Sequence, residues 1–139
     1  MLIDTNIIVY AHNKESQYFL ESTKFLERLL VKRKVFFAIQ NLLESYSVFT
    51  KILKKTLTQS QTLEIVKYYF SHPNSQIIYP TEKTAKILFE LLKKYKVEGE
   101  KIYDLNLVAL MIENNIKTIY TKNIKDFRGI KEIKSIDPL

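Results

Sequence analysis

The sequence predicts an α/β domain built around a mostly parallel sheet. Short apolar runs that read as strands alternate with longer segments of helical periodicity, which is typical of parallel strands joined by crossover helices. Hydrophobic residues make up 46% of the chain, which fits a globular protein. A chain of 139 residues can bury one core of its own, so we expect a single domain over residues 1–139.

Apolar runs and turn residues delimit the individual elements. The first strand runs from Met1 to Asp4, and the segment 72–75, which contains a proline and an asparagine, forms a turn before the third strand. The segment 80–82 is a helix start, and Gly99 marks a loop before the last long helix. We expect strands at 1–4, 35–39, 76–79, 117–120 and 133–136, and helices at 6–12, 15–31, 41–55, 58–72, 80–95 and 104–114.

The charge balance favours a polyanionic partner. The chain has 22 Lys and Arg against 15 Asp and Glu, a net charge of +7 and a pI near 9.4, which suits nucleic acid or an acidic protein. It has no cysteine, which excludes a disulfide framework and a thiolate metal site. No apolar stretch approaches the length of a membrane span and no signal peptide pattern precedes the first strand, so we expect a cytoplasmic protein.

Only four aspartates occur in the chain, and three of them stand near strand or helix ends. Asp4 closes the first strand, Asp104 opens a helix, and Asp126 follows soon after the fourth strand. Open α/β sheets bind their ligands at the carboxyl ends of the strands, so we expect these carboxylates to share one site. A carboxylate cluster that stays charged calls for a cation, most simply a divalent metal. The pattern therefore predicts a metal-dependent enzyme that acts on phosphate.

A second interpretation of these acids needs no metal. Asp, Thr and Asn are preferred helix N-caps because their oxygens accept backbone N–H bonds, so Asp4 in the string Asp4-Thr5-Asn6 could simply cap a helix, as could Asp104. Glu44 is also open to two interpretations. It lies on the polar stripe of a helix, where a glutamate is usually solvated, but its height after the second strand matches that of Asp4 if the two strands are neighbours.

Other kinds of catalytic site find little support. His12 and His72 flank helix ends without a ligand spacing, and we expect both at the surface. The glycines are Gly99 and Gly129, so a Gly-rich phosphate loop is absent. Ser45 lacks the flanking glycines of an esterase nucleophile.

Positive charge is concentrated in short runs, one of which borders an acid. Lys122, Lys125 and Arg128 surround Asp126, and cations beside a metal-binding carboxylate suit a phosphodiester backbone. The remaining runs are interpreted as solvated faces, and lysine runs carry no base preference. They are Lys32-Arg33-Lys34, Lys51 with Lys54-Lys55, and Lys93-Lys94 with Lys96.

Four short sequence motifs follow one another in a characteristic order along nearly the whole chain. They are MLIDTNIIVY at 1–10, NLLE at 41–44, YDLN at 103–106 and TKNIKDF at 121–127. Together they resemble the PIN-domain ribonucleases, most closely the VapC-type toxins of prokaryotic toxin–antitoxin pairs. The resemblance implies a three-layer α/β/α fold with a central parallel sheet of four to five strands in the order 3-2-1-4-5. It also implies an endoribonuclease that uses Mg²⁺ or Mn²⁺.

The resemblance gives the acids a role. The family residues that match Asp4, Glu44 and Asp104 gather around the metal at the carboxyl end of the sheet. Mg²⁺ keeps several waters, so few direct carboxylates suffice, and the metal would lower the pKa of a bound water and stabilise charge on the scissile phosphate. With no histidine expected in the site, attack by water should leave a 5′-phosphate and a 3′-hydroxyl.

One position departs from the family pattern. Two residues after the strand-ending Thr121, where the family often has a fourth aspartate, this chain has Asn123. We expect Asp126, one helical turn further on, to supply the fourth charge through a water, although it could be only a helix-end residue. Thr5, Asn6 and Thr121, with Asn123, would hold carboxylates or waters by hydrogen bonds.

The resemblance further implies RNA as substrate, a homodimer, and a cognate antitoxin that covers the acidic cleft. Five aromatic residues could form a partner surface, although helical spacing places most of them, Tyr46 and Phe49 first, in the core. The other three are Tyr68, Tyr69 and Phe70.

Three other functions remain as alternatives. A receiver-like phosphoacceptor domain would need an acidic pair after the first strand and a lone aspartate after the third, and the chain has neither. An inactive PIN fold that binds RNA or protein is made plausible by Asn123. The same active site could also serve housekeeping RNA processing or cut structured DNA.

Overall fold

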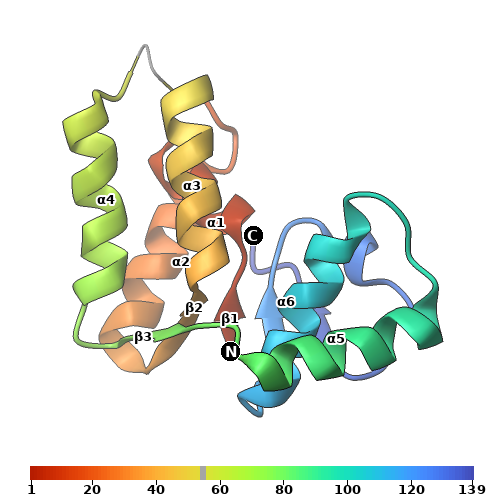
Figure 1. Ribbon diagram of the computed structural model, residues 1–139. Coiled ribbons are helices and arrows are strands. Elements are labelled where there is room, and N and C mark those ends of the chain that lie inside the picture. Colours follow the sequence, from red (N-terminus) through yellow and green to blue (C-terminus); the bar gives the residue numbers. More distant parts are fainter. Residues whose placement is uncertain (54–55) are drawn as a thin grey trace.

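The protein is built on a central five-stranded sheet. A computed structural model describes residues 1–53 and 56–139 (Figure 1). All four strand pairs are parallel and the order is β3-β2-β1-β4-β5, which confirms the expected fold. The strands are β1 (Leu2–Ile3), β2 (Val35–Ala38), β3 (Ser75–Ile78), β4 (Thr118–Tyr120) and β5 (Lys134–Ile136).

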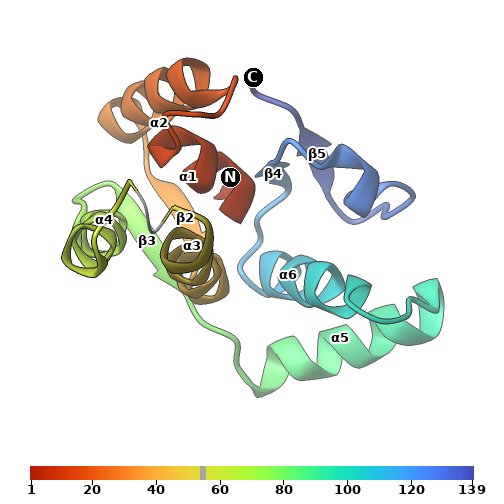
Figure 2. The same ribbon diagram turned by 90° about the horizontal axis from the view of Figure 1, so that it is seen from above.

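Helices cover both faces of the sheet and make three layers (Figures 1 and 2). One layer contains α1 (Thr5–His12), α2 (Phe19–Lys32), α3 (Ile39–Ile52) and α4 (Gln59–Ser71). The other contains α5 (Glu82–Tyr95) and α6 (Lys101–Glu113). No helix within the described residues is long and apolar enough to cross a bilayer.

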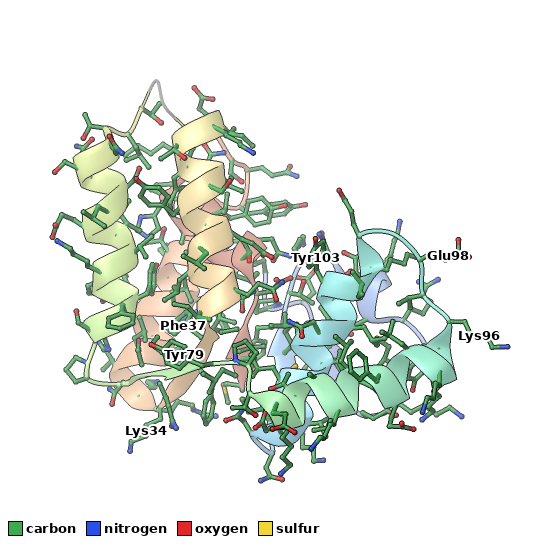
Figure 3. The ribbon with its side chains drawn as sticks, in the orientation of Figure 1. Lys34, Phe37, Tyr79, Lys96, Glu98 and Tyr103 are labelled. Atoms are coloured by element: carbon green, nitrogen blue, oxygen red, sulfur yellow. The ribbon has the colours of Figure 1, made fainter. Side chains whose placement is uncertain are left out.

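The alternation of side chains along the central strands gives each face its own core. On β1, Leu2 packs in the core that includes α5 and α6, whereas Ile3 packs in the core of the α1–α4 layer. Phe37 on β2, labelled in Figure 3, is fully buried in the α1–α4 core, while its neighbour Ala38 belongs to the opposite one. This two-sided burial explains why the strands read as continuous apolar runs.

Most predicted boundaries agree with the structure, and two differences are informative. Helix α2 begins at Phe19 rather than 15, because side chains in the preceding turn accept backbone N–H bonds, as Ser16 Oγ does from Tyr18 at 3.1 Å. Helix α6 begins at Lys101 rather than 104. The predicted end of the 41–55 helix, and with it the run Lys54-Lys55, lies outside the described residues.

The expectation that both histidines lie at the surface is wrong for His12. Its Nε2 lies 2.9 Å from the Tyr69 hydroxyl, and its ring packs edge-on against Phe49. Burial lowers the pKa of His12 to about 4, so the ring is neutral near pH 7. His72 is half-buried, and its Nδ1 accepts a hydrogen bond from the backbone N–H of Asn74.

The five aromatic residues considered as a partner surface divide between core and exterior. Phe49 and Tyr69 are buried, as helical spacing predicts, and Tyr46 is half-buried. Tyr68 and Phe70 each expose 50% of their surface on α4.

Candidate active site

The carboxyl ends of three neighbouring strands bring the first acids together. β1 lies between β2 and β4, and the backbone N–H of Asp4 donates to the carbonyl of Tyr120 at 3.0 Å. Thr121 therefore leaves β4 at the same height as Asp4. On the other side, β2 ends at Ala38 and leads directly into α3, which carries Glu44. The height inferred for Glu44 from the sequence is thus confirmed.

All four acids proposed from the sequence line one pocket of about 330 Å³. Asp4 and Glu44 come from the α1–α4 layer, Asp104 comes from α6 in the opposite layer, and Asp126 comes from a 3₁₀ turn, η1 (Ile124–Phe127). The pocket is therefore formed where the two helical layers meet above the sheet. Its other lining residues are Thr5, Asn6, Val9, Tyr10, Val48 and Asn123.

Asp4 is held by three hydrogen bonds. Its Oδ1 accepts from the backbone N–H of Thr5 at 2.7 Å, so it is the N-cap of α1. Its Oδ2 accepts from Thr121 Oγ1 at 2.6 Å and from Asn6 Nδ2 at 2.7 Å. The capping interpretation and the pocket interpretation of Asp4 are both correct, because one oxygen caps while the side chain lines the pocket.

Glu44 is positioned by its neighbours rather than left to solvent. Its Oε2 accepts from Thr5 Oγ1 at 2.6 Å and its Oε1 accepts from Gln40 Nε2 at 2.8 Å. Gln40 in turn accepts from Asn106 Nδ2 on α6 at 3.1 Å, and Asn41 Nδ2 donates to Thr5 Oγ1 at 3.1 Å. Sequence reasoning missed the contribution of Gln40 and Asn41, although Gln40 precedes Glu44 by one helical turn on the same polar stripe.

The capping interpretation is wrong for Asp104. Helix α6 begins three residues earlier at Lys101, and Glu100 occupies the N-cap position. Within the described residues the carboxylate of Asp104 accepts no hydrogen bond, and neither does that of Asp126, which is exposed on η1. These two carboxylates are therefore the free ones of the pocket.

The pocket holds negative charge that no cation of the described residues balances in an ion pair. Partial burial and the charges of Asp126, Asp4 and Glu44 raise the pKa of Asp104 to about 6, and Lys101 opposes this rise. Burial also raises the pKa of Asp4, against the hydrogen bonds it receives. Across residues 1–53 and 56–139, no lysine or arginine nitrogen lies within 4.0 Å of any of the four carboxylates.

The donor set suits a hydrated hard cation. Carboxylate, amide and hydroxyl oxygens are the ligands that Mg²⁺ and Mn²⁺ prefer. As the side chains stand, no three acidic or histidine side chains of the described residues are arranged to hold one ion directly. Mg²⁺ retains several waters and needs only one or two direct carboxylates, so the residues present fit such an ion. Asp104 and Asp126 have the free oxygens for direct contact.

A larger basic hollow of about 750 Å³ adjoins the acids and shares Tyr10, Asn123 and Asp126 with their pocket. Lys122 Nζ forms an ion pair with Asp137 at 2.8 Å and lies 4.3 Å from the centre of the Tyr18 ring. Lys125 and Arg128 are exposed and form no ion pair with a described residue. Of the three cations predicted to face RNA, Lys122 is therefore already neutralised within the protein.

Two tyrosines complete the hollow and were not predicted from the sequence. Tyr10 and Tyr18 lie with ring centroids 5.0 Å apart at its wall. Tyr18 was expected inside a helix, whereas it belongs to the turn before α2. Because α2 begins only at Phe19, Tyr18 lies in the preceding turn, where its ring lines the basic hollow.

Comparison with known proteins agrees with this architecture. Residues 1–133 match the family model described as PIN domain. Ribonuclease VapC37 from Mycobacterium tuberculosis is 25% identical over 134 residues, which cover 94% of this chain and 93% of the relative. No residue role follows from this similarity alone.

Solved structures show the same fold. VapC20 from Mycobacterium tuberculosis, a toxin that cleaves the sarcin-ricin loop, has a TM-score of 0.71 at 12% identity and matches 95% of this chain and 97% of its own. VapBC2 from Rickettsia felis, bound to a DNA fragment of its promoter, has a TM-score of 0.69 at 24% identity, with 97% and 96% covered. Since the family model spans nearly the whole chain, the protein belongs to the PIN-domain family.

Proposed function

We propose that this protein is an endoribonuclease that depends on Mg²⁺ or Mn²⁺ and acts as the toxin of a type II toxin–antitoxin pair. The observation that carries the proposal is the pocket in which Asp4, Glu44, Asp104 and Asp126 meet without an ion pair to any described lysine or arginine. Similarity to Ribonuclease VapC37 supports RNA as the substrate. The net charge of +7 supports a polyanionic ligand in general.

In this proposal the four acids divide into two pairs. Asp104 and Asp126, whose oxygens accept no hydrogen bond from the described residues, would contact the ion directly or through a water. Asp4 and Glu44 are fixed in orientation, with Thr5 donating to both, and would complete the site from the sheet edge. When bound, the ion supplies activation of water and neutralisation of charge on the scissile phosphate.

The basic hollow would hold RNA beside the acids. Lys125 and Arg128 are free to contact phosphates, and such contacts give affinity without sequence preference. Tyr10 and Tyr18 offer ring faces against which an unpaired base can stack. Lys122 would contribute less, because its charge is held by Asp137.

A cognate antitoxin and a homodimer belong to the same proposal. A toxin–antitoxin complex from Klebsiella pneumoniae matches 99% of this chain with a TM-score of 0.69 at 20% identity, and this likeness supports a protein partner. A partner that places a cationic side chain in the acidic pocket would neutralise the carboxylates and block the ion.

Cleavage of a labelled single-stranded RNA of mixed sequence tests the activity. We expect cleavage with Mg²⁺ or Mn²⁺, products with a 5′-phosphate and a 3′-hydroxyl, and loss of cleavage in EDTA. Asp4→Asn, purified identically, should be inactive while it still binds RNA. Equal cleavage by the variant, or cleavage that survives EDTA, would mean a contaminant or another mechanism. RNA binding without cleavage at any Mn²⁺ concentration would favour the inactive binding module, for which Asn123 is the specific reason.

Toxicity is tested separately in cells. Expression should arrest growth, Asp4→Asn should not, and co-expression of a small protein encoded next to the gene should relieve the arrest. Active cleavage in vitro with normal growth on expression would favour a housekeeping nuclease.

A further inference from the structure

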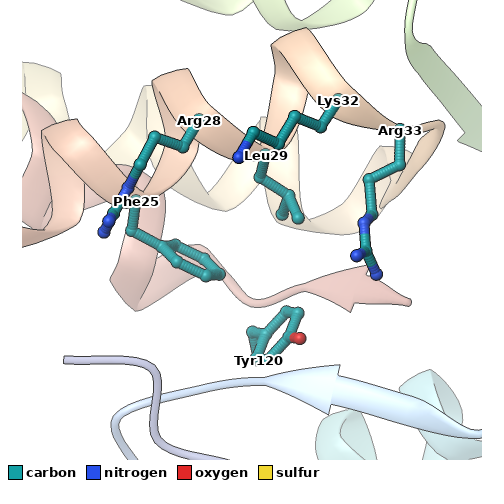
Figure 4. A pocket seen from close by; sticks show the side chains of 6 residues that line it. All are labelled: Phe25, Arg28, Leu29, Lys32, Arg33 and Tyr120. Carbon is teal, nitrogen blue, oxygen red and sulfur yellow. The ribbon is translucent and has the colours of Figure 1, made fainter.

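A second basic hollow lies between α2 and β4, apart from the acids. It has a volume of about 270 Å³ and shares no lining residue with the pocket of the acids or with the basic hollow beside it. We call it the α2–β4 pocket (Figure 4). It is lined by Phe25, Arg28, Leu29, Lys32, Arg33 and Tyr120.

Three cations in this pocket have no acidic partner. Arg28, Lys32 and Arg33 lie on the last turns of α2 and just after it, and none pairs with a carboxylate within 4.0 Å in the described part of the chain. Like charges one helical turn apart, as Arg28 and Lys32 are, repel one another. An anion in the pocket would remove this repulsion.

Two aromatic rings form the apolar part of the pocket. Phe25 and Tyr120 meet edge to face, with ring centroids 5.0 Å apart and planes at 78°. Both side chains are half-buried, so they keep accessible surface. In Figure 4 the Arg33 guanidinium lies on one side of the Tyr120 ring and Arg28 extends on the far side of Phe25. The rings thus lie between positive groups.

We propose that the α2–β4 pocket binds a nucleotide unit, with the phosphate held by Arg28, Lys32 and Arg33 and the base against Phe25 and Tyr120. Guanidinium groups suit phosphate oxygens, and aromatic faces accept any base. The volume lies just below the range of ordinary small-molecule pockets, which begins at about 300 Å³, and suits one nucleotide rather than a larger ligand. The site goes beyond RNA cleavage, and it needs neither the metal nor the acids.

Free nucleotide and an RNA segment outside the cleavage site share this chemistry. The test therefore uses AMP, inorganic phosphate and a short single-stranded RNA, all in EDTA so that cleavage plays no part. Backbone NMR signals of Phe25, Leu29 and Tyr120 should shift and saturate with AMP. Phosphate alone should bind more weakly, since it gains nothing from the rings.

Matched variants separate a built site from general positive charge. The double variant Arg28→Gln, Arg33→Gln should bind AMP with an affinity at least about tenfold lower, as expected for lost charged hydrogen bonds. Lys83→Gln with Lys117→Gln removes the same charge from exposed positions elsewhere and should leave AMP binding unchanged. Tyr120→Leu, which keeps an apolar side chain, should weaken AMP but not phosphate. Thermal melts establish that each variant is folded.

Each outcome has a defined meaning. An equal loss of AMP affinity in both double variants would overturn the proposal. So would the absence of a saturable shift of the NMR signals when AMP or RNA is added to the wild-type protein. If RNA shifts the same signals, the slope of log affinity against log salt should become shallower by about 1.4 in the Arg28 and Arg33 variant, for two lost phosphate contacts. If only AMP shifts them, the site is one for free nucleotide. Neither result depends on whether the acids cleave RNA.

Discussion

Thr121 Oγ1 donates a hydrogen bond of 2.6 Å to Oδ2 of Asp4, a residue 117 positions earlier in the chain. The same hydroxyl accepts from Asn6 Nδ2 at 3.0 Å and from the backbone N–H of Asn123 at 2.9 Å. Thr121 is fully buried, so this oxygen joins the ends of β1 and β4 to the segment that carries η1. A single hydroxyl therefore orients one acid and anchors the loop that supplies another.

Replacing Thr121 by valine should destabilise the protein by about 1 to 3 kcal/mol, because the Asp4 carboxylate and the backbone N–H of Asn123 lose their hydrogen-bond partner. Valine keeps the shape of the side chain, so packing is little changed. Thr118→Val, at the half-buried first position of β4, is the matched control and should have a much smaller effect. Urea unfolding of the three proteins measures the difference. An equal loss in both variants would mean that β-strand packing, and not the hydroxyl, carries the effect.

Asp104→Asn should stabilise the metal-free protein at neutral pH by roughly 1 kcal/mol, or a few degrees of melting temperature, because it removes a partly buried charge that the other acids also repel. Mn²⁺ should stabilise the wild-type protein by mass action and the variant much less. Thermal melts in EDTA and in Mn²⁺ measure both effects. Glu98→Gln, which removes an exposed acid outside the pocket, should match the wild-type response. An equal Mn²⁺ shift in wild type and Asp104→Asn would remove Asp104 from the metal site.

The free energy of unfolding should depend on pH in a way that reflects the titration of Asp104. Its pKa is raised to about 6 in the folded protein, against about 3.9 when unfolded, so its contribution to stability is complete below about pH 4 and is lost as the pH rises through about 6. The stability gained by Asp104→Asn in EDTA should therefore grow between pH 4 and pH 7. His12, whose pKa is lowered to about 4, works in the opposite sense but contributes equally to both proteins. A constant difference across this range would contradict the repulsion.

Local patterns in the sequence were enough to predict the alternation of strands and helices and to single out the four acids as candidates, whereas the order of the strands came from the resemblance to the PIN-domain family. Apolar runs that end at Asp4 and Thr121 identify strand ends, and parallel strands place such ends at one edge of the sheet. The side chains that contact these residues were harder to predict from the sequence. Gln40 meets Asn106 only because α3 and α6 approach from opposite layers, and the half-buried Tyr18 lies in a turn that helical periodicity did not predict.

Burial was the other source of error. His12 is the last residue of α1, and no local signal shows that α4 would bring Tyr69 against it, 57 positions later. The start of α6 was placed at Asp104 because aspartate is a preferred cap, whereas the helix begins in a run without a capping side chain. The contact between His12 and Tyr69 is tertiary, so local propensity could not indicate it.

Position 123 departs from the family pattern, because it holds an asparagine where the family often has a fourth aspartate. Asp126 lines both the pocket of the acids and the basic hollow beside it, and its charge contributes to the raised pKa of Asp104. If Asp126 supplies the fourth charge, Asp126→Asn should reduce the cleavage rate by tenfold or more. A tenfold loss corresponds to an activation free energy that is about 1.4 kcal/mol higher. Asn123→Ala should cost less, since an amide brings no charge. Single-turnover cleavage at several Mn²⁺ concentrations measures both the rate and the apparent metal affinity.

Asn123→Asp is the decisive companion variant. The backbone N–H of residue 123 is held by Thr121, so an added carboxylate would start from a fixed position at the rim of the pocket. If it raises metal affinity and rate together while Asp126→Asn leaves both unchanged, position 123 is the true ligand position and Asp126 is only a residue of η1. If Asp126→Asn abolishes cleavage and Asn123→Asp adds little, the charge missing at position 123 is supplied from one turn further along the chain.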